Sequence, residues 1–410
     1  MLDERIIDLL IERLTSRIEE GNSYVLKEIG ESIKKIGALN VTSAQQLQQV
    51  LKYGGNFDKI VKKLAEITNK NVKEIYEIFE EVAKSDYQFA RQFYEYRNKE
   101  YIPYEQNYAL RRQVEALARI TAEKYVNLSQ TRVIGYSIKD LNGKTVFQEL
   151  SKVYSNTIDK AVLAVAQGKS TFDEQMYSTI KSIGGSGLKT VDYASGRSMR
   201  LDSAVRMNLK GALRNLHNET QALIGQEFGS DGVEVSVHLN PAPDHAEVQG
   251  RQFSKEEFKK FQSDQDAVDY TGKVFLKEHD GHDRRSISEY NCYHYVFDIV
   301  LGVSKPNYTE EQLQEIINSN NEGFEFDGQH YTNYEGTQLQ RQLETAIRRQ
   351  KDIHTIARAS AKQNLVEECQ ENITKLTQKY RDLCEISGLP TKVDRLRVSG
   401  YKKINVAKMK

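Results

Sequence analysis

The sequence is short of several residue types, and each shortage narrows what the chain can be. Its 410 residues include no tryptophan, only five prolines and only three cysteines, far apart and without a CxxC pair. An odd number of isolated cysteines (Cys292, Cys369 and Cys384) does not form a disulfide framework. We therefore expect reduced thiols and synthesis inside a cell.

Long apolar runs and a net charge are also missing. No segment approaches the roughly 18 consecutive apolar residues that a membrane-spanning helix needs. The first residues, Met-Leu-Asp-Glu-Arg-Ile-Ile-Asp, lack the basic start and apolar run of a signal peptide. The 58 basic and 58 acidic residues cancel, so the whole molecule does not steer toward nucleic acid or anionic lipid. We expect no membrane contact.

Most of what remains is charged amphipathic helix. Charged residues make up 28% of the chain and hydrophobic residues 39%, which suits long solvated helices better than a compact α/β enzyme. In residues 1–37 apolar residues recur at helical spacing, and Gly21 punctuates the pattern. These apolar positions are Ile6, Leu9, Leu10, Leu14 and Ile18. The sequence predicts a predominantly α-helical α+β fold with a helical N-terminal half.

Breaks in the pattern divide the chain into five regions. Residues 1–127 are a helical region for partner contact, and residues 128–230 are a helical region with a glycine-rich turn. Residues 231–336 are a small polar-braced α+β module, centred on 230–305. Residues 337–390 are a long C-terminal helix, or two helices with a bend, and residues 391–410 are a basic tail. Further helices are predicted at Asn71–Tyr96, Leu110–Tyr125, Phe147–Gln167, Phe172–Ile183, Leu201–Phe228 and Lys255–Phe261, with an N-cap at Thr42-Ser43 and a helix end at Gly54-Gly55-Asn56.

The strand and turn signals lie mainly in the centre of the chain. Val233–His238 alternates cleanly and is the best strand, whereas Tyr293–Leu301 suits either a buried strand or a short helix. Gly184-Gly185-Ser186-Gly187 lacks the Gly-Lys-Ser/Thr ending of a phosphate loop and has no apolar strand before it. A helix terminator followed by a turn accounts for it better.

The candidate site lies between His238 and Gly302, which holds five of the eight histidines on turn-rich backbone. Its polar cluster comprises Asp244, His245, Gln249, Gly250, Asn291, Cys292 and His294. The interpretation that we favour is structural: Pro241 and Pro243 stiffen a turn, and buried histidines hydrogen-bond through both ring nitrogens. On this interpretation the chain is no enzyme and has no cofactor.

Three chemical alternatives stay open for the same residues. Zinc is the metal that fits, held by His245, His282, Cys292 and His294, although the Cys292-x-His294 spacing is unusual. A nuclease of the His-Asn-His kind has the right residue order, but Asn291 and His294 are too close together. A Cys292 nucleophile with a histidine base is the third, without identifiable oxyanion donors.

The tail carries seven basic side chains and one acidic one. Its candidate contacts to nucleic acid are Lys392, Arg395, Arg397, Lys402 and Lys403. Clustered lysine and arginine can neutralise phosphates, although a solubilising terminus is an equal account.

Five separated phrases resemble the minor capsid protein 2 family of tailed bacteriophages, relatives of the Mu F-like head morphogenesis proteins. They are Gly187-Leu-Lys-Thr-Val-Asp-Tyr-Ala-Ser-Gly-Arg197 with Ala204-Val-Arg206; Pro241-Ala-Pro-Asp-His245 with Gln249-Gly-Arg-Gln-Phe253; Asn291-Cys-Tyr-His294 with Gly302-Val-Ser-Lys-Pro306; Tyr334-Glu-Gly-Thr-Gln-Leu-Gln-Arg341; and Asp394-Arg-Leu-Arg-Val398. The residues of the first phrase that carry the motif are Asp192, Tyr193, Ser195, Gly196, Arg197 and Arg206. The resemblance covers roughly residues 130–400.

The resemblance implies a low-copy protein of the phage head interior, made in the host cytoplasm and associated with the portal vertex. Its implied partners are portal, capsid or scaffold proteins, together with packaged double-stranded DNA through the basic tail. The alternative that it implies is a virion-borne DNA-binding or metal-dependent DNA-processing protein. Two positions depart from the family pattern: Val248 replaces an aromatic residue before Gln-Gly, and Tyr293 replaces the arginine after the cysteine.

Overall fold

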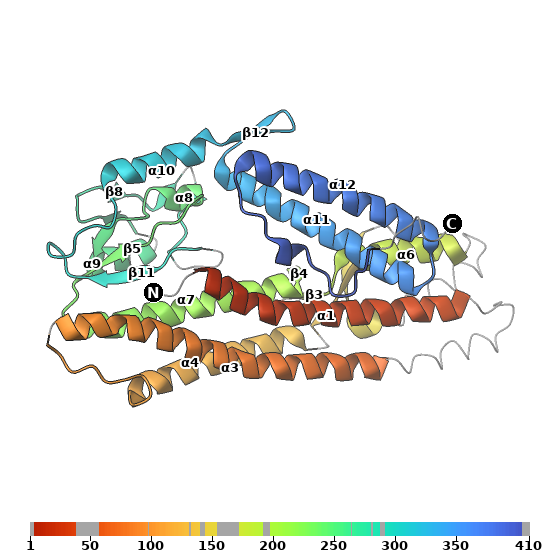
Figure 1. The fold of residues 1–410 in the computed structure, drawn as a ribbon, viewed down its shortest axis with the longest axis horizontal. Coiled ribbons are helices and arrows are strands. Elements are labelled where there is room, and N and C mark those ends of the chain that lie inside the picture. Colours follow the sequence, from red (N-terminus) through yellow and green to blue (C-terminus); the bar gives the residue numbers. More distant parts are fainter. Residues whose placement is uncertain are drawn as a thin grey trace.

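Long helices form the N-terminal half and lie along the longest axis of the molecule (Figure 1). They are α1 (Glu4–Gly37), α3 (Phe57–Tyr96), α4 (Tyr108–Ser129) and α7 (Leu201–Glu227). The computed structural model describes residues 4–37, 57–96, 98–130, 133–139, 144–153, 172–191, 197–263, 265–279, 282–287 and 292–403. The predicted Thr42-Ser43 cap and Gly54-Gly55-Asn56 helix end lie outside these ranges. The predominantly helical α+β fold is confirmed.

Helix α1 buries one apolar stripe against its neighbours, but the stripe differs from the predicted one. The buried residues are Ile7, Leu10, Ile11, Leu14 and Ile18. Leu9, predicted as part of this stripe, is exposed, which corrects its assignment. Gly21 does not interrupt the helix either, because α1 runs through it. A Cβ at Gly21 would lie 3.1 Å from Leu64 and 3.2 Å from Ile67, so glycine there permits close packing on α3.

A four-stranded antiparallel sheet in the order β2-β1-β3-β4 follows these helices in the chain. Its strands are β1 (Ile134–Lys139), β2 (Thr145–Glu149), β3 (Lys189–Val191) and β4 (Ser198–Arg200). The helix predicted from Phe147 was wrong at its start, because Phe147 pairs with Ser137 across the β1–β2 ladder. Helical residues begin at Leu150, and 154–171 lie outside the described residues.

Helix α6 (Phe172–Ser186) contains most of the glycine-rich run and ends where the sequence predicted a terminator. Gly187 follows it with φ +64°, a left-handed conformation that glycine adopts without a Cβ clash. The chain then turns directly into β3.

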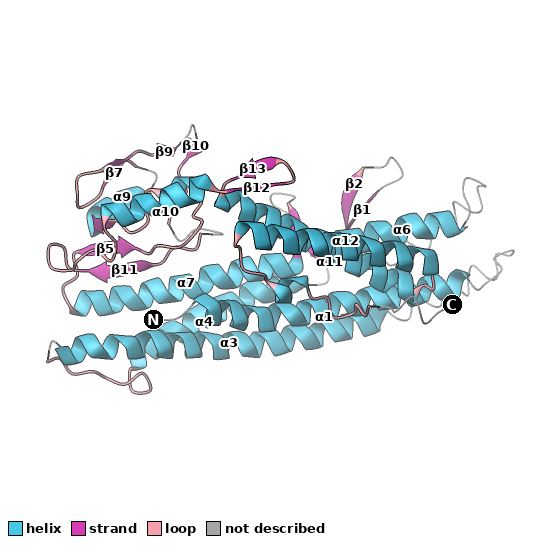
Figure 2. Cartoon of the chain, turned by 45° about the horizontal axis from the view of Figure 1, so that its top comes forward, coloured by secondary structure: helices cyan, strands magenta, loops and turns pink. Residues whose placement is uncertain are grey.

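The α+β module lies beside the end of α7 and contains a three-stranded antiparallel sheet in the order β11-β5-β6 (Figures 1 and 2). Its strands are β5 (Gly232–Val235), β6 (Gln252–Ser254) and β11 (Val296–Ile299); its helices are α8 (Pro243–Ala246), α9 (Lys255–Gln262) and α10 (Glu310–Glu322). Two short hairpins pair β7 (Ala267–Val268) with β8 (Val274–Phe275), and β9 (Glu278–His279) with β10 (His282–Asp283). The segment left open between strand and helix therefore contains a strand, β11.

The C-terminal part forms a helical hairpin in place of a single long helix. A small hairpin of β12 (Phe324–Phe326) and β13 (Gln329–Tyr331) leads into α11 (Asn333–Ala359), which packs along α12 (Gln363–Ser387). The chain reverses at Ala361, whose φ is +58°. Gly388 ends α12 in the left-handed conformation. A 3₁₀ helix, Val393–Leu396, then packs back on α11.

Glycines allow helix α11 to pack closely against α6 and α1. Two neighbouring glycines of α6 provide a matched pair of substitutions. A Cβ at Gly184 would lie 2.7 Å from the backbone N and Cα of Ile353, whereas one at Gly185 would meet only Ile353 Cδ1, at 3.9 Å. We expect Gly184→Ala to lower the free energy of unfolding by about 1–3 kcal/mol through overpacking. Gly185→Ala should be neutral or stabilise by up to about 1 kcal/mol. Urea denaturation compares them, and equal effects would contradict the described packing.

A buried ion network ties the N-terminal helices to the C-terminal hairpin. The guanidinium of Arg200 lies 3.1 Å from Glu19 on α1, 3.2 Å from Asp202 on α7 and 3.3 Å from Asp352 on α11. Arg348 also pairs with Asp202. Because all these groups are withdrawn from water, each charge depends on its partners.

Stability is expected to depend on pH through Asp352. Burial raises the pKa of Asp352 to about 7 against the attraction of Arg200, with Glu19 adding to the rise. In the unfolded chain an aspartate has a pKa of about 3.9, so between these values the folded protein binds more protons. The contribution of Asp352 to the free energy of unfolding therefore falls as the pH rises through this window. Urea denaturation at pH values of about 5 and about 7.5 should show wild type losing stability relative to Asp352→Asn. A relative gain would contradict this sign.

Candidate functional site

The central sheet of the module positions the predicted polar cluster. Val233 and Val235 of β5 point into the core, and Val235 pairs with Val296 of β11. Beyond the strands the pairing continues: the Ser236 amide donates to the Tyr295 carbonyl oxygen at 2.9 Å, and the Tyr295 amide donates to Ser236 Oγ at 2.8 Å. The segments 236–238 and 292–295 therefore run side by side and bring two parts of the cluster together.

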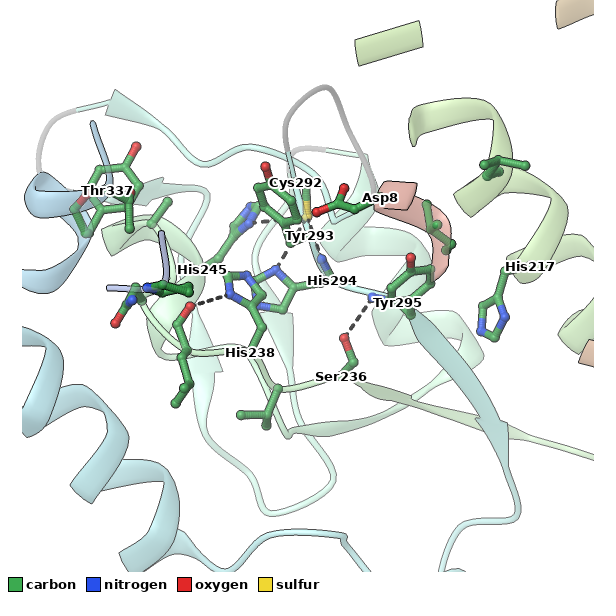
Figure 3. A pocket seen from close by; sticks show the side chains of 18 of the residues that line it. Asp8, His217, Ser236, His238, His245, Cys292, Tyr293, His294, Tyr295 and Thr337 are labelled. Carbon is green, nitrogen blue, oxygen red and sulfur yellow. Dashed lines mark hydrogen bonds between the residues drawn. The ribbon is translucent and has the colours of Figure 1, made fainter. Parts of the chain in front are cut away.

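At the centre of the cluster a cysteine lies between two histidines (Figure 3). Cys292 Sγ is 3.6 Å from Nδ1 of His245 and 3.4 Å from Nδ1 of His294. The three side chains come from α8 and from the loop before β11, and each is at most 4% exposed. One ligand atom from each lies within 4.8 Å of the others, so together they could hold a metal ion.

Hydrogen bonds on the far side of each imidazole fix its orientation. His245 Nε2 donates to the Arg285 carbonyl oxygen at 2.9 Å. His294 Nε2 lies 3.3 Å from Gln249 Oε1, which also accepts the His238 backbone amide at 3.2 Å. Since a backbone amide only donates, the amide of Gln249 is oriented with its oxygen toward both groups, and His294 must donate from Nε2. In both neutral rings the Nδ1 lone pair therefore faces the sulfur.

An ion pair braces the histidine of α8 from outside. Arg285 binds Asp244 through two hydrogen bonds, Nε to Oδ2 at 2.7 Å and Nη2 to Oδ1 at 2.6 Å. Burial opposes ionisation of Asp244, but the hydrogen bonds of Arg285 outweigh it and hold the pKa of this carboxyl below its usual range. Asp244 Oδ2 is also 3.8 Å from His245 Nε2.

The pKa values of the two central histidines shift in opposite directions. Burial lowers the pKa of His294 to about 2, helped by the nearby His238 and His245, so this ring is neutral. Burial also disfavours the charged form of His245, but the hydrogen bond and charge of Cys292 outweigh it and raise its pKa. The same geometry therefore permits a thiolate–imidazolium pair between Cys292 and His245, the arrangement of a cysteine nucleophile with its base.

The cluster forms part of the wall of a cavity of about 1020 Å³. Segments distant in the sequence line it, including Asp8 of α1, Asp86 of α3, His217 of α7, and Gln340 of α11. Figure 3 shows His238, His245, Cys292 and His294 together at this cavity. A ligand or water in the cavity would thus reach the cluster from one side.

Cationic side chains surround Tyr293, which lies between Cys292 and His294 in the sequence. Lys210 Nζ lies 4.6 Å above the Tyr293 ring, and Arg341 Nη2 donates to its hydroxyl at 3.1 Å. Burial opposes ionisation of Tyr293, yet the charges of Lys210, Arg341, Arg395 and Lys392 outweigh it and lower its pKa to about 8. This wall of the cavity is suited to an anion.

The phage minor capsid protein 2 family model matches residues 2–385, nearly the whole chain. The chain belongs to this family. No curated protein and no solved structure matches it significantly. The family establishes a bacteriophage minor capsid protein, and the architecture above is that of one member. None of the described helices is long and apolar enough to span a membrane.

For this family member, the structure brings most of the predicted cluster together. Asp244, His245, Gln249, Cys292 and His294 are in one network, and Gly250 begins the turn into β6 with φ +72° and its amide bonded to the Val235 carbonyl. Asn291 lies outside the described residues, and so does the side chain of His282. The described group that could hold a metal ion therefore has three of the four residues predicted for it.

Of the residues predicted to carry the family motif, the two that the structure describes, Arg197 and Arg206, are not part of this network. Arg206 on α7 pairs with Glu12 of α1 at 2.7 Å, so it holds two helices together, and Arg197 is exposed. The remaining motif residues, Asp192, Tyr193, Ser195 and Gly196, lie outside the described residues.

Fewer of the predicted basic contacts in the tail face solvent than the sequence indicated. Lys392 and Arg395 line the cavity, and Arg395 lies 3.8 Å from Glu344. Arg397 is exposed but pairs with Asp394 at 3.0 Å. Lys402 and Lys403 are exposed. Of the five predicted nucleic-acid contacts, two therefore face the interior.

Several site residues were missed by sequence reasoning. Arg285 had no signal beyond a polar loop, and Asp8 and Asp86 lie in a region that we expected to serve packing or partner contact. His238 was detectable, since it ends the clearest alternating strand of the chain. Its Nδ1 lies 2.9 Å from the Leu239 carbonyl, and its ring centroid is 4.3 Å from that of His294.

Proposed function

We propose that this minor capsid protein is an internal component of the phage head that associates with the portal vertex during assembly. The observation that carries the proposal is the family match over residues 2–385. The fold supports it: the described residues include six helices of 22 to 40 residues, which offer extended surfaces to a ring of subunits.

The portal contact that we propose is the outer face of α4. This α4 face is defined by the exposed apolar side chains Tyr108 and Val126, and Ile120 is exposed at its edge, about a third of a turn around the helix. Tyr108 and Val126 lie about five turns apart on the same side of the helix. Charged residues, including Arg111, Arg112 and Arg119, are exposed between them. Apolar anchors with a polar surround are typical of protein interfaces.

Co-expression with the portal protein of the same phage tests this proposal. We expect the wild-type chain to co-purify with the portal, and Tyr108→Glu/Val126→Glu to lose this binding while its circular dichroism is unchanged. The matched control is Val274→Glu/Leu276→Glu, which alters exposed apolar residues in and next to β8, a strand on the opposite side of the molecule from α4 (Figure 1). No co-purification of wild type would refute the portal association. Equal loss in both variants would refute the α4 face.

Contact with packaged DNA is the finer part of the proposal. Lys402 and Lys403 are exposed and remain available to phosphates, whereas Lys392 and Arg395 face the cavity. These two described cations by themselves predict weak binding without sequence preference, and they contribute about −2 to the slope of log K against log salt. The alternative, DNA processing that depends on a metal, draws support from the cations around Tyr293, beside the His/Cys cluster. A cleavage assay with duplex DNA and Zn²⁺ or Mn²⁺ separates the two functions.

A further inference from the structure

We propose that His245, Cys292 and His294 form a Zn²⁺ site, with the fourth coordination position facing the cavity. This inference goes beyond the head-protein function and does not depend on it. Two imidazoles and a thiolate are a donor set that zinc prefers, and alkaline-earth ions do not. The three side chains are buried and converge on one point from two segments of the chain.

The spacing of the donor atoms matches tetrahedral zinc. With Zn–S of about 2.3 Å and Zn–N of about 2.0–2.1 Å, a tetrahedral angle places sulfur and nitrogen about 3.6 Å apart. The two sulfur–nitrogen distances are 3.6 Å for His245 and 3.4 Å for His294. The two sulfur–nitrogen spacings therefore match zinc, and with all three ligand atoms within 4.8 Å of one another, closure of the two imidazoles on a shared ion completes the site.

The hydrogen bonds behind the ligands are those of a metal centre. Ligating histidines usually donate their second ring N–H to a carbonyl or carboxylate, which fixes the tautomer. Here His245 donates to the Arg285 carbonyl and His294 donates to Gln249 Oε1. Arg285 is in turn held by Asp244, and Gln249 by the His238 amide. Both Nδ1 atoms are thus presented to the same sulfur.

Zinc explains why Nδ1 of both histidines faces the sulfur of Cys292, which a thiol alone explains less well. A thiol has one proton and can donate it to only one of the two Nδ1 atoms, whereas a metal ion accepts both nitrogen lone pairs and the thiolate together. A Cys292–His245 ion pair, the competing account, assigns no role to the orientation of His294. His238 lines the cavity beside His294 and lies near the fourth position, which water can occupy.

Elemental analysis of the purified full-length chain, incubated with Zn²⁺ and then dialysed, tests the site. We expect about one zinc per chain in wild type and almost none in Cys292→Ala. The matched control is Cys369→Ala, which removes another buried cysteine, on α12, and should retain zinc. Wild type without zinc, or equal retention in Cys292→Ala, would overturn the proposal.

A measurement on wild type covers the case in which Cys292→Ala does not fold. Co²⁺ replacing zinc should give a thiolate-to-metal charge-transfer band in the near ultraviolet, in wild type and in Cys369→Ala alike. Bound zinc should also protect Cys292 from alkylation, as peptide mass spectrometry can show. No such band in the folded, cobalt-loaded protein would refute ligation by the cysteine.

Discussion

Replacing Arg200 with alanine is expected to lower the free energy of unfolding by about 3–5 kcal/mol, because it leaves buried carboxylates without their cation. Its guanidinium contacts Glu19, Asp202 and Asp352 at 3.1–3.3 Å. Removing one member of a buried ion network lowers the free energy of unfolding by more than the intact network contributes to it, because the remaining charges stay in a poorly polarisable interior. The effect should be the largest of any single arginine in this network.

Urea denaturation followed by far-ultraviolet circular dichroism measures this loss, since the chain has no tryptophan to report it by fluorescence. The matched control is Arg91→Ala, which removes an exposed ion pair with Glu95 on the surface of α3. That change should cost no more than about 0.5 kcal/mol. If Arg200→Ala cost as little as the control, the buried network would not hold α1, α7 and α11 together.

Zinc is expected to stabilise the module strongly. A ligand that binds only the folded state adds about 4 kcal/mol at a concentration one thousand times its dissociation constant. The ligands join α8 to the loop before β11, two segments about fifty residues apart, so their cross-link restrains the module locally. Treatment with a chelator should reverse this stabilisation.

Hydrogen exchange with and without Zn²⁺ gives the local readout. We expect slower amide exchange in zinc-loaded protein at 236–250 and 292–299, with α3 and α4 unchanged. His294→Ala should abolish the difference, whereas His354→Ala, which removes a buried histidine of α11, should keep it. Uniform protection across the chain, or none in the module, would contradict a site at the cluster.

Local sequence patterns predicted those helices and strands whose buried face is set by the spacing of their own apolar residues. The apolar spacing of Leu201–Phe228 predicted α7 almost to the residue, and the alternating valines predicted β5. Strand β1 was missed although Ile134, Tyr136 and Ile138 alternate and are buried. The dipeptide Asn142-Gly143, which favours tight hairpin turns, was an available signal between β1 and β2.

Reversal of the chain at Ala361 was harder to foresee. No glycine or proline marks this position, and a left-handed alanine is intrinsically unfavourable. Packing of α11 on α12 offsets that cost, and burial of this kind depends on residues far apart in sequence. A pattern confined to a few turns of helix therefore predicts one helix here.

The candidate site was predictable in composition but not in arrangement. The density of histidine, asparagine and cysteine identified the segment, and the resemblance identified the family. The convergence of His245 and His294 on one sulfur depends on the register of β5 with β11. The contributions of Asp8 and Arg285 depend on how α1 and a distant loop pack against the module, which no local pattern contains.

An asymmetric cryo-EM reconstruction of the portal vertex in virions of this phage tests whether the chain lies at the portal inside the head. It would compare wild-type particles with particles that lack this chain. The account predicts additional density on the head-interior side of the portal in wild type, with long helices that fit α3 and α4 and are absent from the mutant. Identical portal vertices in the two particles, with the chain found elsewhere or missing from the head, would contradict it.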